Sequence, residues 1–444
     1  MSTTPASPPL AEKIAARTAN VAVLGLGYVG LPLLRRFFDA GFPVLGYDLD
    51  GSKIDALKAG RCYISHLGDG FAERLAASDR FDATTDVARL AEADAVLICV
   101  PTPLGRHLEP DLSYVESTTR AVAQSLRPGQ LVVLESTTYP GTTRDVVLPI
   151  LEAGGLRCGS DFFVGYSPER EDPGRSDQTT RGVPKLVGGI DPASGEAVLA
   201  LYAATFERVV PVRSAEVAES AKLLENIYRA VNIALANEMK LVLGEMGIDV
   251  WEVIDAAATK PFGFQPFYPG PGLGGHCIPI DPFYFAWKAR EVGQNTRFVE
   301  LAGEINRSMP RHVVAQLQQA LNDHGVALRD ARILVLGVAY KPNISDLRES
   351  PAFEIIEQLR ERGANVEYSD PHVPSTPRVR RHDLQMTSVE LSAEGLANYD
   401  AVVIATHHAA FDWSMIFAHA RLIVDTRGVS RTVETPIHAK VVRA

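Results

Sequence analysis

Cysteine is scarce in this sequence, with four residues among 444: Cys62, Cys99, Cys158 and Cys277. Their number and scatter exclude a disulfide-stapled scaffold, and no two are spaced as Cys-x-x-Cys, which disfavours a structural zinc site. A chain of this length can bury a large core without such cross-links. Reduced thiols, as in a cytoplasmic protein, are therefore the simpler expectation.

Long apolar runs and an excess of basic residues are also missing. No stretch approaches the ~18 consecutive apolar residues that span a bilayer, and the opening MSTTPASPPLAEK has no apolar core of a secretory signal. The formal net charge of −10 argues against general nucleic-acid binding, which needs a basic surface. We expect a cytoplasmic protein with neither membrane nor nucleic-acid partners, although a few local cations could still bind a small anion.

Short apolar runs that end in turn or polar residues alternate with helical stretches in the first and last thirds of the chain. They predict buried strands over residues 20–25, 43–48, 93–100, 131–135, 331–337, 365–370, 400–406 and 421–425. Strand–helix alternation of this kind is typical of a doubly wound parallel sheet. The sequence therefore predicts two Rossmann-like α/β domains.

The middle of the chain reads as helical. Residues 215–247 contain no proline and predict one long helix, suited to connect domains or to form a dimer spine. Further helical stretches are expected over 250–259 and 284–324, on either side of a loop rich in glycine, proline and aromatic residues. We expect a tail with little structure over residues 1–17, followed by a first Rossmann-like domain (18–212), a central helical domain (213–325) and a second Rossmann-like domain (326–444).

Residues 25–30 (GLGYVG) follow the first predicted strand and open a helix. In a dinucleotide loop Gly25 would make the tight turn, Gly27 would let the backbone approach a pyrophosphate, and Gly30 would let helix and strand pack closely. The pyrophosphate would then lie at the positive N-terminus of the helix. The intervening Tyr28 and Val29 are assigned to the same cofactor site.

Asp48 ends the next predicted strand, about 20 residues further on, where a carboxylate binds the ribose hydroxyls of NAD. A carboxylate there would repel the 2′-phosphate of NADP, so the pattern predicts NAD. Lys53 is close enough in sequence to pair with Asp48 or to meet a phosphate. Pro101 and Thr102, after the third predicted strand, are also assigned to the cofactor site.

Cys277 lies in the glycine-rich run GLGGHC, with Asp281 four residues later. Structural cysteines usually lie in apolar strands, as Cys99 does, so a catalytic thiol is the favoured interpretation. A thiolate adds to an aldehyde, the adduct gives hydride to NAD, and water opens the resulting thioester to a carboxylate. Asp281 could help to activate the thiol. His276 is interpreted as shaping the loop rather than as a base, and with no fourth ligand in view no metal is expected.

Four further candidate residues have a plain alternative. Lys222 and Asn226 are spaced i, i+4, so they share one helix face that could donate hydrogen bonds to an oxyanion or could simply be solvated. Glu169 lies just past an expected strand and could be a general base or a surface acid. Thr137 could orient a water or could be a turn hydroxyl.

The second α/β domain has a single Gly337 in place of GxGxxG, so a second dinucleotide site is not expected there. Lys341, Arg348 and Arg427 lie at or just after predicted strand ends, where open α/β sheets bind ligands. Three cations there suit a phosphorylated ligand, with internal salt bridges as the alternative.

Six motifs together resemble the UDP-glucose/GDP-mannose dehydrogenase family: GLGYVGLPL, ESTTYPGTT, YSPEREDPG, AKLLENIYRAVNIALANE, GPGLGGHCIPIDPFYF and KPNISDLRESP. They follow in order and cover about residues 20–430. The resemblance implies an enzyme that oxidises C6 of a nucleotide sugar to a carboxylate with two NAD in succession, through a cysteine thioester. It also implies a homodimer formed by the central helical section, and a C-terminal domain that binds the UDP moiety.

Carried over motif by motif, the resemblance makes Cys277 the nucleophile. It implies that Lys222 and Asn226 stabilise the oxyanion, that Asp281 assists activation of the thiol or hydrolysis, and that Glu169 serves in thioester hydrolysis with water placed by Thr137. It also implies that Arg348 lies at the junction of NAD and substrate. The residues that it implies for binding the UDP-sugar are Gly274, Lys341, Arg427, Glu169, Lys222 and Asn226.

Within the family, residues 259–290 look most like the bacterial branch that acts on UDP-N-acetylglucosamine for surface polysaccharides such as O-antigen or capsule. Ile280 stands where the UDP-glucose branch typically carries a basic residue. The branch acting on UDP-N-acetylmannosamine shares GGHCIP and is the nearest competitor. A two-electron hydroxyacid dehydrogenase, which would share the long helix and its lysine, is a further alternative, but the GGHC thiol and the second α/β domain argue against it. A non-catalytic NAD-sensing protein is another, and it would not need Cys277, Lys222 and Glu169 together.

Overall fold

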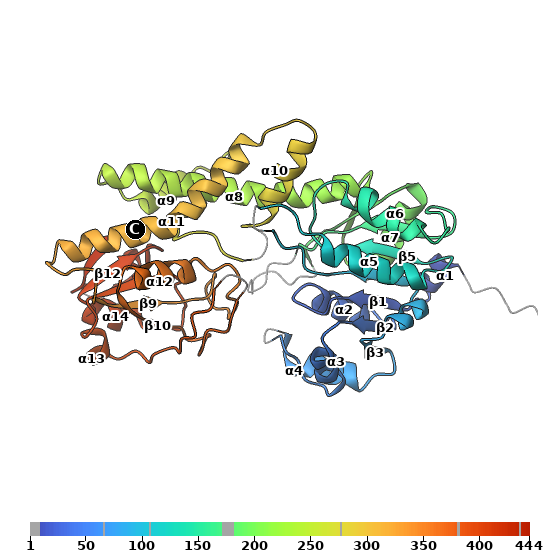
Figure 1. Cartoon of the computed structure of the whole chain (residues 1–444), viewed down its shortest axis with the longest axis horizontal. Helices are drawn as coiled ribbons and strands as arrows, with labels where there is room; N and C mark the ends of the chain where they lie inside the picture. The colour runs from blue at the N-terminus through green and yellow to red at the C-terminus, as the bar shows by residue number, and fades with distance from the viewer. Residues whose placement is uncertain are drawn as a thin grey trace, which may run out of the picture. The chain divides into compact units, whose positions relative to one another are not determined.

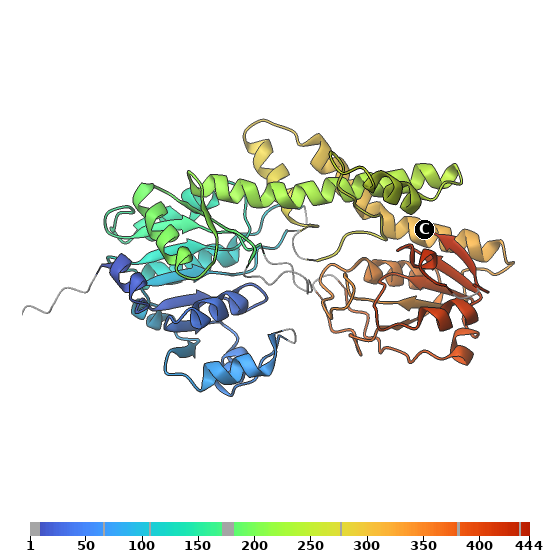
Figure 2. The ribbon, with the colours of Figure 1, turned by 180° about the vertical axis from the view of Figure 1, so that it is seen from behind.

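The protein is described by a computed structural model that covers residues 9–64, 67–105, 108–170, 182–275, 278–379, 382–434 and 437–444. The chain divides into two compact units, one formed by Met1–Glu225 with Trp287–Gly293 and the other by Asn226–Ala286 with Gln294–Ala444. Each unit contains a sheet with helices on both faces (Figure 1, Figure 2). The prediction of two Rossmann-like α/β folds is thus confirmed.

The first unit contains an eight-stranded sheet in the order β3-β2-β1-β4-β5-β6-β7-β8. Its strands are β1 (Val21–Leu24), β2 (Val44–Tyr47), β3 (Phe81–Thr84), β4 (Ala95–Ile98), β5 (Leu131–Leu134), β6 (Phe163–Tyr166), β7 (Lys185–Gly189) and β8 (Val209–Pro211). All neighbours run parallel except β6 and β7, which are antiparallel. The four strands predicted over stated ranges are present, and so is the strand expected just before Glu169, which is β6; β3, β7 and β8 were not expected.

Side chains of β1 alternate between two hydrophobic cores, which explains why this sheet is covered on both faces. Val21 and Val23 belong to one core and Ala22 and Leu24 to the other. The covering helices are α1 (Leu10–Ala15), α2 (Gly30–Asp39), α3 (Gly51–Lys58), α4 (Asp69–Ala76), α5 (Ser113–Ser125), α6 (Leu148–Glu152) and α7 (Pro192–Ala203).

Helix α1 corrects the expectation that residues 1–17 have little structure. Leu10 and Ile14 are buried in the core, and Lys13 pairs with Asp94 at 2.8 Å. Packing against the core stabilises this helix of about one and a half turns. The local sequence, which is rich in proline, does not predict it.

The second unit contains a parallel five-stranded sheet in the order β10-β9-β11-β12-β13. Its strands are β9 (Arg332–Leu336), β10 (Asn365–Ser369), β11 (Ala401–Ile404), β12 (Leu422–Asp425) and β13 (Lys440–Arg443), and its shorter helices are α12 (Pro351–Glu361), α13 (Ala393–Leu396) and α14 (Trp413–His419). As in β1, alternate side chains of β9 enter two different cores. Only β13 was not expected.

The helical middle consists of α8 (Ala215–Glu245), α9 (Val250–Ala258), α10 (Asp281–Glu291) and α11 (Arg297–Asn322). The single helix expected over 284–324 is two helices, because the chain turns at Gly293, which has φ +74°. The division between the units falls within α8. In the described part of the chain, no helix has the length and apolar character needed to cross a membrane.

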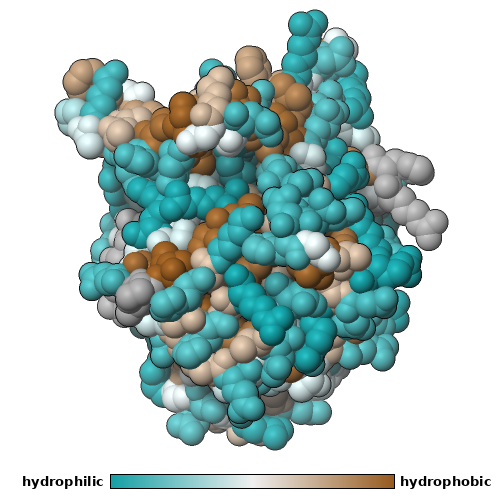
Figure 3. Space-filling model, turned by 90° about the vertical axis from the view of Figure 1, so that its left-hand side faces the viewer, coloured by the Kyte–Doolittle hydropathy of each residue, from teal (hydrophilic) through white to brown (hydrophobic). Residues whose placement is uncertain are grey.

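Helix α8 carries a stripe of exposed apolar side chains. At spacings of about four, seven or eleven residues they fall on one side of the helix, and they are Leu224, Tyr228, Leu235, Met239, Val242 and Met246. On the molecular face drawn in Figure 3, hydrophobic side chains likewise gather in patches between hydrophilic ones.

Candidate functional site

The turn after β1 has the geometry of a dinucleotide loop. Gly25 has φ +90°, and a Cβ there would lie 2.6 Å from the carbonyl oxygen of Cys99. A Cβ on Gly30 would lie 2.0 Å from the carbonyl oxygen of Gly25, whereas one on Gly27 would meet no atom within 4 Å. The first and third glycines are thus required by the protein itself, and the second leaves open space above the N-terminus of α2, where a phosphate binds favourably.

Asp48 lies at the end of β2 and is 8% exposed. Its Oδ2 accepts a hydrogen bond of 2.8 Å from the Leu26 amide and forms an ion pair of 2.9 Å with Lys53 Nζ. Of the two possibilities considered for Lys53, the structure shows the pairing with Asp48. The Tyr63 hydroxyl also holds this loop, since it donates to the Leu26 carbonyl at 2.6 Å.

The strand order reverses between β1 and β4, which is where open α/β sheets bind ligands. Pro101 and Thr102 follow β4 on this edge; Pro101 is exposed and Thr102 is buried. Tyr28 is 41% exposed and Val29 caps α2. These residues therefore border the same open edge as the glycine loop. Arg348 belongs to the other unit.

Thr137 and Glu169 come from the next two strands. Leu134 of β5 is paired with Tyr166 of β6. Thr137 lies three residues after Leu134, and Glu169 lies three residues after Tyr166. Both are half-buried. Because the carboxyl ends of parallel strands lie at one edge of the sheet, both residues follow strands at the edge that carries the dinucleotide loop.

A buried ion pair lies beneath Glu169. The Lys185 Nζ is 2.7 Å from Glu135 Oε2, 3.0 Å from the Pro168 carbonyl oxygen and 3.7 Å from Glu169 Oε2. The Tyr202 hydroxyl donates to the other oxygen of Glu135. Burial raises the pKa of Glu135, and although burial alone would lower the pKa of Lys185, the charges of Glu135 and Glu169 raise it. A buried cation therefore faces the Glu169 carboxylate.

Lys222 and Asn226 are both buried, at 6% and 0% exposure, so the alternative of a solvated helix face is wrong. The Lys222 ammonium donates to the Glu169 carbonyl oxygen. In the second unit, Asn226 Nδ2 donates to Asp281 Oδ2 at 2.5 Å, and the Arg229 guanidinium donates to Asn226 Oδ1. These contacts fix both polar side chains of α8 and join Asn226 to the first residue of α10.

Cys277 and His276 lie outside the described residues, but the glycines before them are placed. A Cβ on Gly274 would lie 2.4 Å from Tyr340 Cβ, and the Gly275 amide donates to the Arg348 carbonyl oxygen at 2.8 Å. Gly275 has φ +88°. The glycine run therefore packs against the segment after β9 that carries Lys341, and no side chain larger than hydrogen fits at Gly274.

Lys341 and Arg427 follow β9 and β12 and are partly exposed. The Arg427 Nε donates to the Ala405 carbonyl oxygen at 2.8 Å, and a Cβ on Gly270 would lie 2.6 Å from its Nη1. Arg348 makes an ion pair with Asp346, from Nη2 at 2.7 Å. The glycine- and proline-rich loop thus contacts Arg427 as well as the segment that carries Lys341. Arg348 makes an internal salt bridge, which was the alternative to ligand binding.

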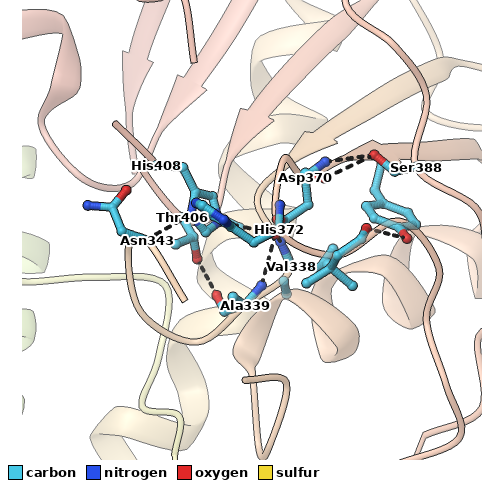
Figure 4. Close-up of polar contacts among 12 residues, drawn as sticks. Val338, Ala339, Asn343, Asp370, His372, Ser388, Thr406 and His408 are labelled. Atoms are coloured by element: carbon cyan, nitrogen blue, oxygen red, sulfur yellow. Dashed lines mark hydrogen bonds and ion pairs between the residues drawn. The ribbon is translucent and has the colours of Figure 1, made fainter. Parts of the chain in front are cut away.

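The second unit has an acid in the place that Asp48 takes in the first. Asp370 follows β10, and its Oδ2 accepts hydrogen bonds from the amides of Val338 (2.7 Å) and Ala339 (3.2 Å), as Figure 4 shows. Gly337, with φ +76°, makes the turn after β9. Asp370 thus closes its own loop with backbone hydrogen bonds, as Asp48 does in the first unit.

Sequence reasoning missed Lys240 on α8, which is 5% exposed. Its Nζ has no hydrogen-bond partner within the described part of the chain. Burial and the nearby charge of Arg427 lower the pKa of Lys240 to about 7. The contacts that bury it come from elements far away in sequence, and no spacing rule on α8 reveals them.

This buried amine predicts a pH-dependent stability. Unfolded lysine keeps its proton to about pH 10.5 but folded Lys240 loses it near pH 7, so the unfolded state binds more protons between these values. Stability contributed at this position therefore rises with pH. At pH 7, Lys240→Met should raise the free energy of unfolding by about 1–3 kcal/mol, since it removes an unsatisfied buried group.

Thermal unfolding of the wild-type protein and of the Lys240→Met variant from pH 7 to pH 10 measures this effect. Substitution of the exposed Lys260 by Met is the matched control. The gain of Lys240→Met should shrink as the pH rises. A gain that is absent at pH 7, or equal to that of Lys260→Met, contradicts the assignment.

Within the described ranges, no group of three or more His, Cys, Asp or Glu side chains is placed to hold a metal ion.

Three sequence models of the UDP-glucose/GDP-mannose dehydrogenase family match the chain: the NAD binding domain over residues 19–206, the central domain over 216–308 and the UDP binding domain over 334–432. A UDP-N-acetyl-D-glucosamine 6-dehydrogenase of Pseudomonas aeruginosa is 35% identical over 394 residues, which is 88% of this chain and 91% of that protein. A UDP-N-acetyl-D-mannosamine dehydrogenase of Pyrococcus horikoshii is 36% identical over 424 residues, 94% of this chain and 97% of that protein.

Solved structures agree with this relationship. A UDP-D-ManNAc dehydrogenase from Pyrococcus horikoshii matches with a TM-score of 0.85 and 33% identity over 95% of this chain and 98% of its own. A UDP-glucose dehydrogenase from Pyrobaculum islandicum matches with a TM-score of 0.82 and 30% identity over 94% and 96%. The chain is a nucleotide-sugar dehydrogenase that uses NAD, and it belongs to the UDP-glucose/GDP-mannose dehydrogenase family.

Proposed function

We propose that the protein oxidises C6 of UDP-N-acetylglucosamine to the carboxylate, consuming two NAD and forming a thioester on Cys277. The observation that carries this proposal is the buried Asn226–Asp281 pair, because Asp281 lies four residues after the thiol and ties the glycine-rich loop to α8. Such an arrangement supports thiol chemistry at a preorganised hydrogen-bond donor. A role in making surface polysaccharide would follow from the product.

The chemistry divides into two oxidations and a hydrolysis. The loop of Gly25–Gly30 and Asp48 would hold NAD, which would supply the hydride acceptor for oxidation of C6 from the alcohol to the aldehyde. The Cys277 thiolate adds to that aldehyde, and the adduct gives a second hydride to a second NAD, so that a thioester remains. Water attacks the thioester, releasing the thiol and the uronate. Each oxidation releases one proton to solvent or to a base.

The other residues stabilise charge or place water. Lys222 and Asn226 would donate to the oxyanion of the tetrahedral intermediates, and burial strengthens such donors. Glu169 would take a proton from the water that Thr137 orients. Its carboxylate lies 3.7 Å from the buried Lys185 ammonium.

The UDP moiety would bind to the second unit at the carboxyl ends of its strands. Lys341 and Arg427 are cations on that edge, and the glycine run that includes Gly274 packs beside Lys341. Arg348 would lie where the nicotinamide and the sugar meet. The match of residues 334–432 to a UDP binding domain supports this placement.

UDP-N-acetylmannosamine is the second candidate substrate, because relatives named for it are as similar to this chain as those named for the N-acetylglucosamine compound. The two sugars differ in configuration at C2 only. We favour UDP-N-acetylglucosamine on the residues around Cys277, whose resemblance to that branch is the strongest.

The test is the ratio of NADH formed to UDP-sugar consumed, with UDP-N-acetylglucosamine, UDP-N-acetylgalactosamine, UDP-N-acetylmannosamine and UDP-glucose in parallel. We expect two NADH per sugar and the highest kcat/KM for UDP-N-acetylglucosamine. The same ratio with another preferred sugar would overturn the substrate but not the mechanism. One NADH per sugar would mean that oxidation ends at the aldehyde, and the role of Cys277 would be lost.

We also propose that the protein is a homodimer formed through α8. The apolar stripe from Leu224 to Met246 is exposed along more than six turns of that helix, and burying it against a second copy would remove it from water.

A further inference from the structure

The loop after β9 carries Lys341 and is held at its far end as well as at its start. Asn343 has φ +62°, and its side-chain oxygen accepts a hydrogen bond of 2.8 Å from the Ala409 amide. The Asn343 amide donates to Nδ1 of His408 at 3.0 Å. At the start, the Thr406 hydroxyl donates to the Ala339 carbonyl oxygen at 2.5 Å. Lys341 therefore lies two residues from a fixed point on either side.

His408 connects the two ends of this loop. Its side chain is fully buried, and Nε2 lies 3.1 Å from the same Asp370 oxygen that accepts from Val338 and Ala339 (Figure 4). Since Nδ1 accepts from the Asn343 amide, the proton of the neutral ring is on Nε2, from which it is donated to Asp370. The His408 ring thus connects Asp370, which binds the amides of residues 338 and 339, to the amide of Asn343.

The surroundings of the ring support this arrangement. Burial opposes ionisation of Asp370, but the hydrogen bonds from His408 and the backbone amides keep its pKa below the ordinary value. The ring centroid of His372 is 4.8 Å and that of Phe411 is 5.6 Å from the His408 ring. His372 contributes only its backbone amide to Asp370, at 2.8 Å, and its side chain is exposed.

We propose that His408 is a positioning residue for UDP-sugar binding, which acts by holding the Lys341 loop between Asp370 and Asn343. This inference rests on the proposed role of Lys341 in binding the UDP-sugar. A phosphate-binding lysine is effective when its loop is ordered before the ligand arrives, because the ligand then bears none of the cost of ordering it.

Matched substitutions separate the two hydrogen bonds of the ring. Asn can supply an acceptor near the place of Nδ1, whereas Gln can supply a donor near the place of Nε2. With the UDP-sugar that is turned over fastest and with saturating NAD, His408→Ala should raise KM for the sugar about tenfold, with kcat and KM for NAD unchanged within about threefold. His408→Asn should restore most of this loss, and His408→Gln should not. His324→Ala, at an exposed position after α11 and outside this cluster, is the matched control and should leave all three parameters unchanged.

A double-mutant cycle with Lys341→Met tests whether His408 acts through that lysine. Lys341→Met alone should raise KM for the sugar at least as much as His408→Ala, and adding His408→Ala to it should change KM little further. His408→Gln can replace His408→Ala in the same double-mutant cycle, so the test does not depend on the folding of the alanine variant.

Three results would overturn the proposal. They are full additivity of the two substitutions, an equal rise of KM for NAD and for the sugar, and rescue by Gln rather than Asn. An unchanged KM in Lys341→Met would remove the premise, and with it the proposed place of the UDP moiety. The proposed oxidation of C6 would stand or fall separately, on the NADH ratio.

Discussion

Cys277→Ser should form no uronate, and its steady-state rate of NADH formation should fall by about a thousandfold or more. A serine hydroxyl stays protonated at neutral pH and is a far weaker nucleophile toward an aldehyde than a thiolate. Without the thiol adduct, the second hydride has no donor and the thioester cannot form. NAD binding should be unchanged, because the glycine loop and Asp48 lie in the first unit, on segments remote in sequence from the thiol.

Product analysis after complete consumption of NAD measures the first part of this expectation, and titration of NAD against protein fluorescence measures the second. Cys62→Ser is the matched control, since Cys62 is a free, half-buried thiol between α3 and α4, where its Sγ donates to the Ile64 carbonyl oxygen. Normal formation of the uronate by the Cys277 variant would eliminate the thioester from the mechanism.

The parts of this protein that sequence reasoning recovered are those that local chemistry determines. The dinucleotide loop is an example, because the positive φ of Gly25 and the close approach of Gly30 are properties of six consecutive residues. The strands were likewise evident wherever both faces are buried, since the run is then continuously apolar. The two α/β folds, the family and NAD are confirmed on this basis, whereas the roles of the individual site residues stay predictions.

The parts that were missed depend on contacts between distant segments. Lys185 is 50 residues from Glu135, and His408 is 65 residues from Asn343. Each of these polar residues would be ordinary on a surface, and only the fold makes it buried and paired. The burial of Lys222 and Asn226 belongs here too, because a helix face with a lysine reads as solvated until the segment that covers it is known.

Glu169→Gln should separate oxidation from hydrolysis. Glutamine fills the same space but cannot accept a proton from water, so the thioester should form at the normal rate and then persist. We expect a burst of two NADH per active site, followed by a steady state slower by about 10²–10⁴-fold. Rapid-mixing absorbance would record the burst, and the intact mass of quenched enzyme would show the sugar nucleotide attached through Cys277.

The shape of this time course tests the place of Glu169 in the reaction. Its carboxylate lies 3.7 Å from the Lys185 ammonium, and the buried Glu135 binds the same ammonium at 2.7 Å. If Glu169 instead served either hydride transfer, the burst would slow together with the steady state and no adduct would accumulate. The exposed Glu207→Gln is the control and should show neither change. A burst of full size with a slow steady state can arise only if the step that needs this carboxylate follows both oxidations.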